Sequence, residues 1–102
     1  MAEFVKAGKV SEVPNFKMKA FNVEEKQITV ANIDGKYFAF EDACTHMHCS
    51  LAGGQLKGKT ITCYCHGAQF DISTGKVLAP PASLPLKVYN VKIEGENILV
   101  EV

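Results

Sequence analysis

Two short cysteine–histidine pairs constrain this chain more than any other feature. Cys44-Thr45-His46 places a thiol and an imidazole close together, and Cys63-Tyr64-Cys65-His66 repeats the pair sixteen residues further on. Two such loops that face each other supply two sulfur and two nitrogen ligands. Zinc accepts that set in a tetrahedron, and a [2Fe–2S] cluster accepts it with both cysteines on one iron and both histidines on the other. The two pairs therefore predict a metal centre with cysteine and histidine ligands.

Length and charge limit what else the chain can be. A chain of 102 residues supports one domain, so we expect residues 1–102 to fold as a single unit. Its 47% apolar and 22% charged residues are typical of a globular protein. Eleven lysines balance eleven carboxylates, and arginine is absent. A chain without net charge or arginine has little to bind a nucleic-acid backbone, so we expect no nucleic-acid partner.

Nothing in the sequence indicates a membrane segment. The longest stretch without Lys, Asp or Glu runs from Ala43 to Leu56, whereas a spanning helix needs about 20 apolar residues. The first six residues lack the apolar core of a signal peptide. We therefore expect a cytoplasmic protein without membrane contact. Four cysteines in that compartment indicate metal or redox chemistry more often than a disulfide scaffold.

The apolar pattern predicts an all-β fold. Alternating residues over 28–33 and the run 37–40 flank Asp34-Gly35, which is a strong signal for a two-residue hairpin. A second hairpin is expected over residues 89–102, with its turn at 94–97. Further strand candidates are residues 16–23 and 60–64. No window has the apolar period of a long helix.

The middle of the chain differs from its ends. All four cysteines, all three histidines and three of the four prolines fall within residues 43–86. We therefore expect a loop-rich subdomain over about 43–86, inserted into a strand-built base of about 1–42 and 87–102. From Ala43 to Ile93 five lysines face a single acid, Asp71. This bias predicts a positive face that steers a partner with an acidic docking surface, although scattered lysines also simply keep a surface soluble.

The ligand segments resemble those of the Rieske iron–sulfur proteins. The resemblance rests on Cys44-Thr45-His46-Met47-His48-Cys49 and Cys63-Tyr64-Cys65-His66-Gly67, and it continues through Phe70-Asp71, residues 74–77, the proline-rich residues 79–82 and Pro85-Leu86. It implies a Rieske-type [2Fe–2S] cluster with Cys44 and Cys63 on one iron and His46 and His66 on the other. It also implies an antiparallel β-sandwich or barrel base carrying an inserted cluster-binding subdomain.

The remaining cysteines, Cys49 and Cys65, match positions that form a disulfide between the cluster loops in respiratory Rieske proteins. Such a bridge would contribute about 3 kcal/mol on the chain-entropy model. Two inert buried thiols are the alternative. A rival ligand set of all four cysteines would leave His46 and His66 unexplained.

Two departures from the respiratory pattern bear on redox tuning. Where respiratory proteins carry a serine and a tyrosine that donate hydrogen bonds to the cluster, this chain has Ala68 and Phe70. A hydrogen bond to a charged acceptor contributes about 1.5–3 kcal/mol, so each missing donor should lower the potential by about 60–130 mV. We expect a potential in the lower half of the Rieske range of about −150 to +300 mV.

Four further residues belong to the expected cluster environment. Met47 provides either an apolar rim or a gap-filling side chain, and His48 is either a solvated histidine or a second titrating group. Pro80 and Pro81 either shape a loop that covers the cluster or form a plain connector.

The resemblance implies a soluble one-electron carrier and not an enzyme. Its expected partners are a flavin reductase and a terminal oxygenase or similar oxidoreductase, and nothing requires more than a monomer. The alternatives are an anchorless respiratory Rieske protein of a quinol-oxidising chain, the small subunit of a nitrite-reductase-like enzyme, and a structural zinc module.

Overall fold

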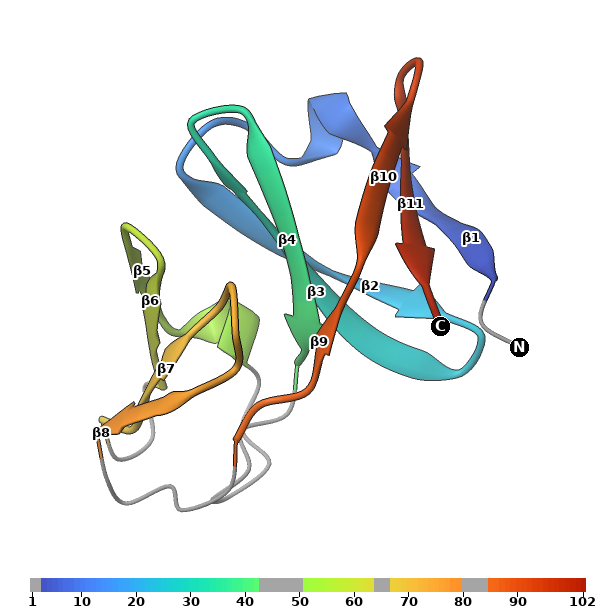
Figure 1. The fold of residues 1–102 in the computed structure, drawn as a ribbon. Helices are drawn as coiled ribbons and strands as arrows, with labels where there is room; N and C mark the ends of the chain where they lie inside the picture. The colour runs from blue at the N-terminus through green and yellow to red at the C-terminus, as the bar shows by residue number, and fades with distance from the viewer. Residues whose placement is uncertain (1–2, 43–50, 64–66, 80–84) are drawn as a thin grey trace.

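A computed structural model describes residues 3–42, 51–63, 67–79 and 85–102 of the chain. Within these ranges eleven strands form three antiparallel sheets, joined by short turns and two single-turn 3-10 helices, η1 (Val10–Glu12) and η2 (Leu51–Gly53). The prediction of an all-β, antiparallel fold is confirmed (Figure 1). No helix in the described ranges has the length and apolar character to cross a membrane.

The three sheets are nested along the chain, with the inserted sheet innermost and the terminal sheet outermost. The terminal sheet has the order β1 (Phe4–Lys9), β11 (Asn97–Glu101), β10 (Val91–Glu94). The central sheet has the order β2 (Lys17–Val23), β3 (Lys26–Ile33), β4 (Lys36–Glu41), β9 (Val88–Tyr89). The inserted sheet has the order β5 (Gln55–Lys57), β6 (Thr60–Thr62), β7 (Gln69–Asp71), β8 (Val77–Ala79).

Both hairpins predicted from the sequence are present. Strands β3 and β4 are joined at Asp34 and Gly35, whose φ angles of 53° and 87° are both left-handed. A type I′ turn requires this conformation, and Asp-Gly adopts it at low cost. The hairpin of β10 and β11 turns at Gly95, whose φ is 62°. Tyr89 lies outside that hairpin, in β9, where it pairs with β4.

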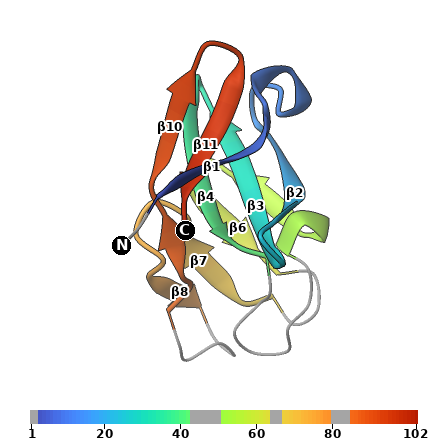
Figure 2. The ribbon, with the colours of Figure 1, turned by 90° about the vertical axis from the view of Figure 1, so that its right-hand side faces the viewer.

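The central sheet is apolar on both faces, which explains why five consecutive residues of β3 are buried. Ile28 and Val30 face the terminal sheet and pack with Ile98 and Val100 of β11. On the opposite face, β3 and β4 contribute to a second core, shared with the inserted sheet. Its buried members are Ala31, Phe40, Leu51, Ile61, Cys63, Ala68, Phe70, Ile72 and Leu86. The molecule therefore stacks three layers, with the inserted sheet on one side (Figures 1 and 2).

The inserted sheet begins and ends at adjacent strands of the base. The chain leaves the base after β4 and returns through β9, which pairs with β4 through Ala39↔Tyr89 and Phe40↔Val88. The Glu41 N–H also donates to the Lys87 carbonyl oxygen at 2.9 Å. The two connections of the insert therefore lie side by side, as Figure 1 shows for the end of β4 and the start of β9.

Gly75 holds the inserted sheet against the segment that returns to the base. Its φ is +82°, and a Cβ built on it would lie 2.0 Å from the Leu86 carbonyl oxygen. The Leu86 N–H donates to the Gly75 carbonyl oxygen at 2.7 Å, and the Leu86 side chain is buried in the shared core. Only glycine allows these two backbones to approach so closely.

We expect Gly75→Ala to lower the free energy of unfolding by more than about 3 kcal/mol, because left-handed strain adds to overlap with the Leu86 carbonyl. Gly58→Ala is a matched control, since Gly58 has a φ of +58° and no atom within 4 Å of the built Cβ. The control should lose only about 1–2 kcal/mol from strain. Thermal unfolding of both variants measures the difference, and equal losses would contradict the close-approach argument.

Candidate metal centre

Three of the residues singled out from the sequence lie in the described part of the chain: Cys63, Ala68 and Phe70. All three are buried and belong to the core shared by the central and inserted sheets. The others lie outside the described residues: Cys44, His46, Met47, His48, Cys49, Cys65, His66, Pro80 and Pro81. The described surroundings of the centre are therefore the residues that flank segments 43–50, 64–66 and 80–84.

Each of these three segments has at least one flank at the same edge of the inserted sheet. Cross-strand pairing aligns Gln55, Thr62, Gln69 and Ala79 in one row. In the chain, η2 precedes this row at Gln55, Cys63 follows it at Thr62, and segment 80–84 begins directly after Ala79. The topology therefore brings the flanks of both cysteine–histidine segments and of the proline-rich segment to the same edge.

The ends of segment 43–50 are joined by hydrogen bonds. The Leu51 N–H donates to the Asp42 carbonyl oxygen at 2.6 Å, and the Ala52 N–H donates to Asp42 Oδ1 at 3.0 Å. The Gly54 N–H in turn donates to the Leu51 carbonyl oxygen at 3.0 Å. Residues 42 and 51 are thus neighbours in space.

The ends of segment 64–66 are joined as well. The Cys63 N–H donates to the Ala68 carbonyl oxygen at 2.8 Å, and the Gly67 N–H donates to the Cys63 carbonyl oxygen at 3.1 Å. Gly67 has a φ of +78°, with no atom within 4 Å of a built Cβ. These two hydrogen bonds fix the backbone of Cys63, one of the predicted ligands.

Among the described residues, the buried core that includes Cys63 is apolar. Cys63 is 2% exposed, Ala68 1% and Phe70 0%, and Leu51 and Leu86 are buried in the same core. Neither a methyl group nor a phenyl ring can donate a hydrogen bond. The side chains of Ala68 and Phe70 therefore supply no hydroxyl donor.

In the described ranges no group of three His, Cys, Asp or Glu side chains is close enough to hold a metal ion. Cys63 is the one predicted ligand within these ranges. It is placed where its backbone is fixed and its side chain is shielded from water, as expected of a ligand in a rigid site.

Most lysines of the insert lie at the opposite end of the inserted sheet. Lys57 pairs with Thr60, and Thr60 pairs with Asp71, in the row at the opposite end of these strands from Gln55, Thr62 and Gln69. Lys59 lies in the turn between β5 and β6, and Lys76 directly precedes β8. These three lysines therefore do not surround the flanks of the cysteine–histidine segments.

Asp71, the acidic residue in this row, has a carboxyl group whose ionised form is stabilised by hydrogen bonds. The Ser73 hydroxyl and N–H both donate to Asp71 Oδ1, at 2.5 and 2.8 Å. These hydrogen bonds, with a smaller contribution from the positive charge of Lys59, lower the pKa of the Asp71 carboxyl below its usual value. The far end of the sheet therefore mixes three lysines with one ionised carboxylate.

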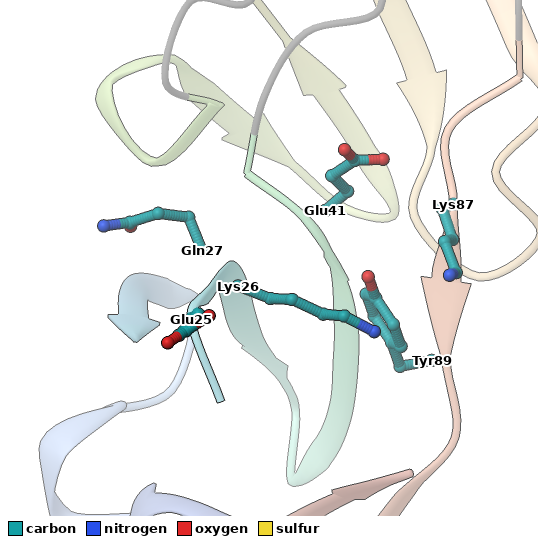
Figure 3. A pocket seen from close by; sticks show the side chains of 6 residues that line it. All are labelled: Glu25, Lys26, Gln27, Glu41, Lys87 and Tyr89. Carbon is teal, nitrogen blue, oxygen red and sulfur yellow. The ribbon is translucent and has the colours of Figure 1, made fainter. Parts of the chain in front are cut away.

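An open hollow of about 350 Å³ lies against the junction of β4 and β9 (Figure 3). Its lining is Glu25, Lys26, Gln27, Glu41, Lys87 and Tyr89. Burial, and then the nearby Glu41 carboxylate, raise the pKa of the Tyr89 hydroxyl. The Lys87 ammonium lies 5.3 Å from the centre of the Tyr89 ring. Two acidic residues and two lysines line the hollow, so its formal net charge is zero and it favours neither an anion nor a cation.

The sequence alone does not single out Asp42, which joins the ends of segment 43–50, or its hydrogen-bond partner Thr29. The Thr29 hydroxyl donates to Asp42 Oδ1 at 2.6 Å, and both side chains are buried. The available signal was weak: a threonine in an apolar strand and a carboxylate two residues before Cys44. A threonine is common in strands, so neither residue marks a site by itself.

Comparisons with known proteins agree with this geometry. The family model of the Rieske [2Fe-2S] domain matches residues 3–90. The biphenyl dioxygenase ferredoxin subunit of Pseudomonas sp. (strain KKS102) is 41% identical over 99 residues, which cover 96% of this chain and 91% of that protein.

Two solved structures show the same fold. The ferredoxin of Sphingomonas yanoikuyae B1 superposes with a TM-score of 0.92 and 32% identity, covering 98% of this chain and 99% of that one. A chain in the complex of reduced oxygenase and oxidised ferredoxin of carbazole 1,9a-dioxygenase gives a TM-score of 0.88 and 30% identity, covering 95% and 91%.

These similarities confirm three predictions made from the sequence: the Rieske-like fold, the Rieske-type [2Fe–2S] cofactor, and an electron carrier in place of an enzyme. The family model spans most of the chain, and the fold and the ferredoxin relatives agree with it. The chain therefore belongs to the Rieske [2Fe–2S] domain family.

Proposed function

We propose that this chain is a soluble, cytoplasmic and monomeric ferredoxin that passes single electrons from a flavin reductase to a terminal oxygenase. The similarity to the ferredoxin subunit of biphenyl dioxygenase, over nearly the full length of both chains, carries the proposal. The similar chain in the carbazole 1,9a-dioxygenase complex supports an oxygenase as the receiving partner.

The proposed cluster ligands are Cys44 and Cys63 on one iron, and His46 and His66 on the other. The described part of the site fits this set. Cys63 is 2% exposed in apolar surroundings, where a thiolate is costly unless a metal neutralises it. The bound cluster supplies one-electron redox chemistry. We further propose that a Cys49–Cys65 disulfide joins the two ligand segments.

Ala68 and Phe70 affect the cluster because neither side chain can donate a hydrogen bond to it. Ala68 follows His66 by two residues, and Phe70 is fully buried beside it in the same core. Both exclude water and place no hydroxyl near Cys63. A site with few donors and a low dielectric disfavours added negative charge, so these residues favour a low reduction potential.

The remaining cluster-environment residues are proposed from their places in the sequence. Met47 and His48 follow the ligand His46 directly, so they would form part of the rim around it. Pro80 and Pro81 follow β8, on the edge where the ligand segments are flanked, and would shape a covering loop.

The proposed acidic docking surface of the partner concerns two groups of lysines. Lys87 lies at the junction of β4 and β9, beside the flanks of the ligand segments. Lys57, Lys59 and Lys76 lie at the far end of the inserted sheet. Lys87 could therefore contact an acidic partner, whereas the other three would act through their field during approach.

We expect a midpoint potential in the lower half of the Rieske range, and we expect Ala68→Ser to raise it by about 60–130 mV. The added hydroxyl would donate to the cluster or to a ligand sulfur, where it stabilises the more negative, reduced state. Redox titration followed by visible absorption measures both values.

Ala39→Ser is the control for this substitution. Ala39 is also 1% exposed, but it lies in the core between the central and terminal sheets. The midpoint potential of the Ala39→Ser variant should match that of the unmodified protein. An equal shift in both variants would contradict the tuning argument, and an unmodified potential in the upper half of the range would favour the quinol-oxidising alternative.

The ligand assignment predicts opposite outcomes for two substitutions. His46→Ala should abolish the visible absorption of the cluster and the bound iron, because it removes a ligand. Cys65→Ser should retain both, because Cys65 is assigned to the disulfide. Iron content and absorbance of the purified variants measure the result, with Cys63→Ala as the cluster-free reference. A site with four cysteine ligands would reverse the two outcomes.

A further inference from the structure

Thr29 is an unusual residue at its position in the central sheet. It lies on the face of β3 that carries Ala31, and it pairs across the sheet with Phe40 of β4. It is 0% exposed. A buried hydroxyl in such surroundings is costly unless it has a hydrogen-bond partner. Its partner is Asp42, whose Oδ1 atom accepts from the Thr29 hydroxyl at 2.6 Å.

Asp42, which directly follows β4, is bonded to both β3 and η2. Its side chain, in a residue only 7% exposed, accepts from Thr29 of β3 and from the Ala52 N–H of η2. Its carbonyl oxygen accepts from the Leu51 N–H at 2.6 Å, and its own N–H donates to the Gln27 carbonyl oxygen at 3.1 Å. One residue thus ties the central sheet to both ends of segment 43–50.

A second buried polar residue of β3 shows that this arrangement is specific to one end of the strand. Asn32 donates to the Val13 carbonyl oxygen at 2.9 Å and accepts from the Gly35 N–H at 3.0 Å. It therefore organises the β3–β4 turn, away from the cluster segments. Thr29, three residues earlier, organises the end of the hairpin that leads into segment 43–50.

The two side chains suit this task. A carboxylate held in the interior requires donors, and hydrogen bonds to it are stronger than those between neutral groups. Threonine is stiff at χ1 because it is β-branched, so its hydroxyl is held in one direction. If Thr29 could not donate, Asp42 would lose a strong partner. Turning its carboxylate toward water would then release the Ala52 N–H as well.

We propose that Thr29 and Asp42 are positioning residues of the cluster site. They hold the two ends of segment 43–50 together, so that the ligands Cys44 and His46 within it are presented rigidly to the cluster. This inference rests on the proposed function, since it takes Cys44 and His46 as ligands. The pair does not touch the reacting group. It acts through the backbone of Asp42, Leu51 and Ala52.

Thr29→Val tests the proposal on the cluster-loaded protein, because valine matches threonine in shape and cannot donate. Two readouts are used: the rate at which an iron chelator bleaches the cluster at 25 °C, and deuterium uptake of the peptide spanning Asp42 to Ala52. We expect both rates to rise by about tenfold, as for loss of a buried hydrogen bond to a charged group. Thr29→Ser keeps the hydroxyl and should restore both rates to within about threefold of the unmodified protein.

Ile98→Val is the control for general loss of stability. Ile98 is 0% exposed in the core between the central and terminal sheets, so its substitution loosens packing far from segment 43–50. It should leave both rates within about twofold, since distant sites act independently. The proposal is overturned if Thr29→Val behaves like Ile98→Val, or if Thr29→Ser behaves like Thr29→Val.

The failure of the proposed function would look different. An unmodified protein that binds no iron would contradict the ligand assignment itself. In that case the deuterium uptake of the Asp42–Ala52 peptide still tests whether Thr29 and Asp42 hold the loop ends. An unchanged uptake in Thr29→Val would overturn the positioning role in either form of the protein.

Discussion

The rest of the structure depends on a central sheet that is buried on both faces. β3 contributes Ile28 and Val30 to one core and Ala31 to the other, so the terminal sheet and the inserted sheet both pack against the same four strands. Burial of apolar surface is the dominant favourable contribution to folding, and here it is shared between two layers. A short chain thereby builds a rigid base whose one end carries the cluster segments.

The segments proposed to hold the cluster are connected to that base by hydrogen bonds between the residues that flank them. Leu51 bonds to Asp42 across segment 43–50, and Cys63 bonds to Ala68 across segment 64–66. A third hydrogen bond, between Leu86 and Gly75, joins the inserted sheet to the chain that returns to the base. Because each loop is fixed at its base, a few ligands per loop suffice to define a site. Within the described residues, the buried side chains that share a core with Cys63 are apolar.

Much of this could be predicted from the sequence, and the exceptions have physical reasons. The hairpins were evident because Asp34-Gly35 and Gly95 mark turns between strongly alternating runs. β1 was not predicted individually, since only Val5 and Ala7 alternate with polar residues and glycine there. β5, β7 and β8 have three residues each, too few to show a period. Thr29 and Asp42 meet only through the fold, so no local pattern announces their hydrogen bond.

The central claim is a cluster held by two cysteines and two histidines on a base that fixes their loops. Pulsed EPR of the reduced protein, with nitrogen-15 incorporated into histidine alone, tests it most directly. We expect hyperfine couplings from two histidine nitrogens on the paramagnetic centre, which disappear together in His46→Ala as the cluster is lost. A reduced centre without histidine nitrogen couplings, or a colourless protein that holds zinc, would contradict the account.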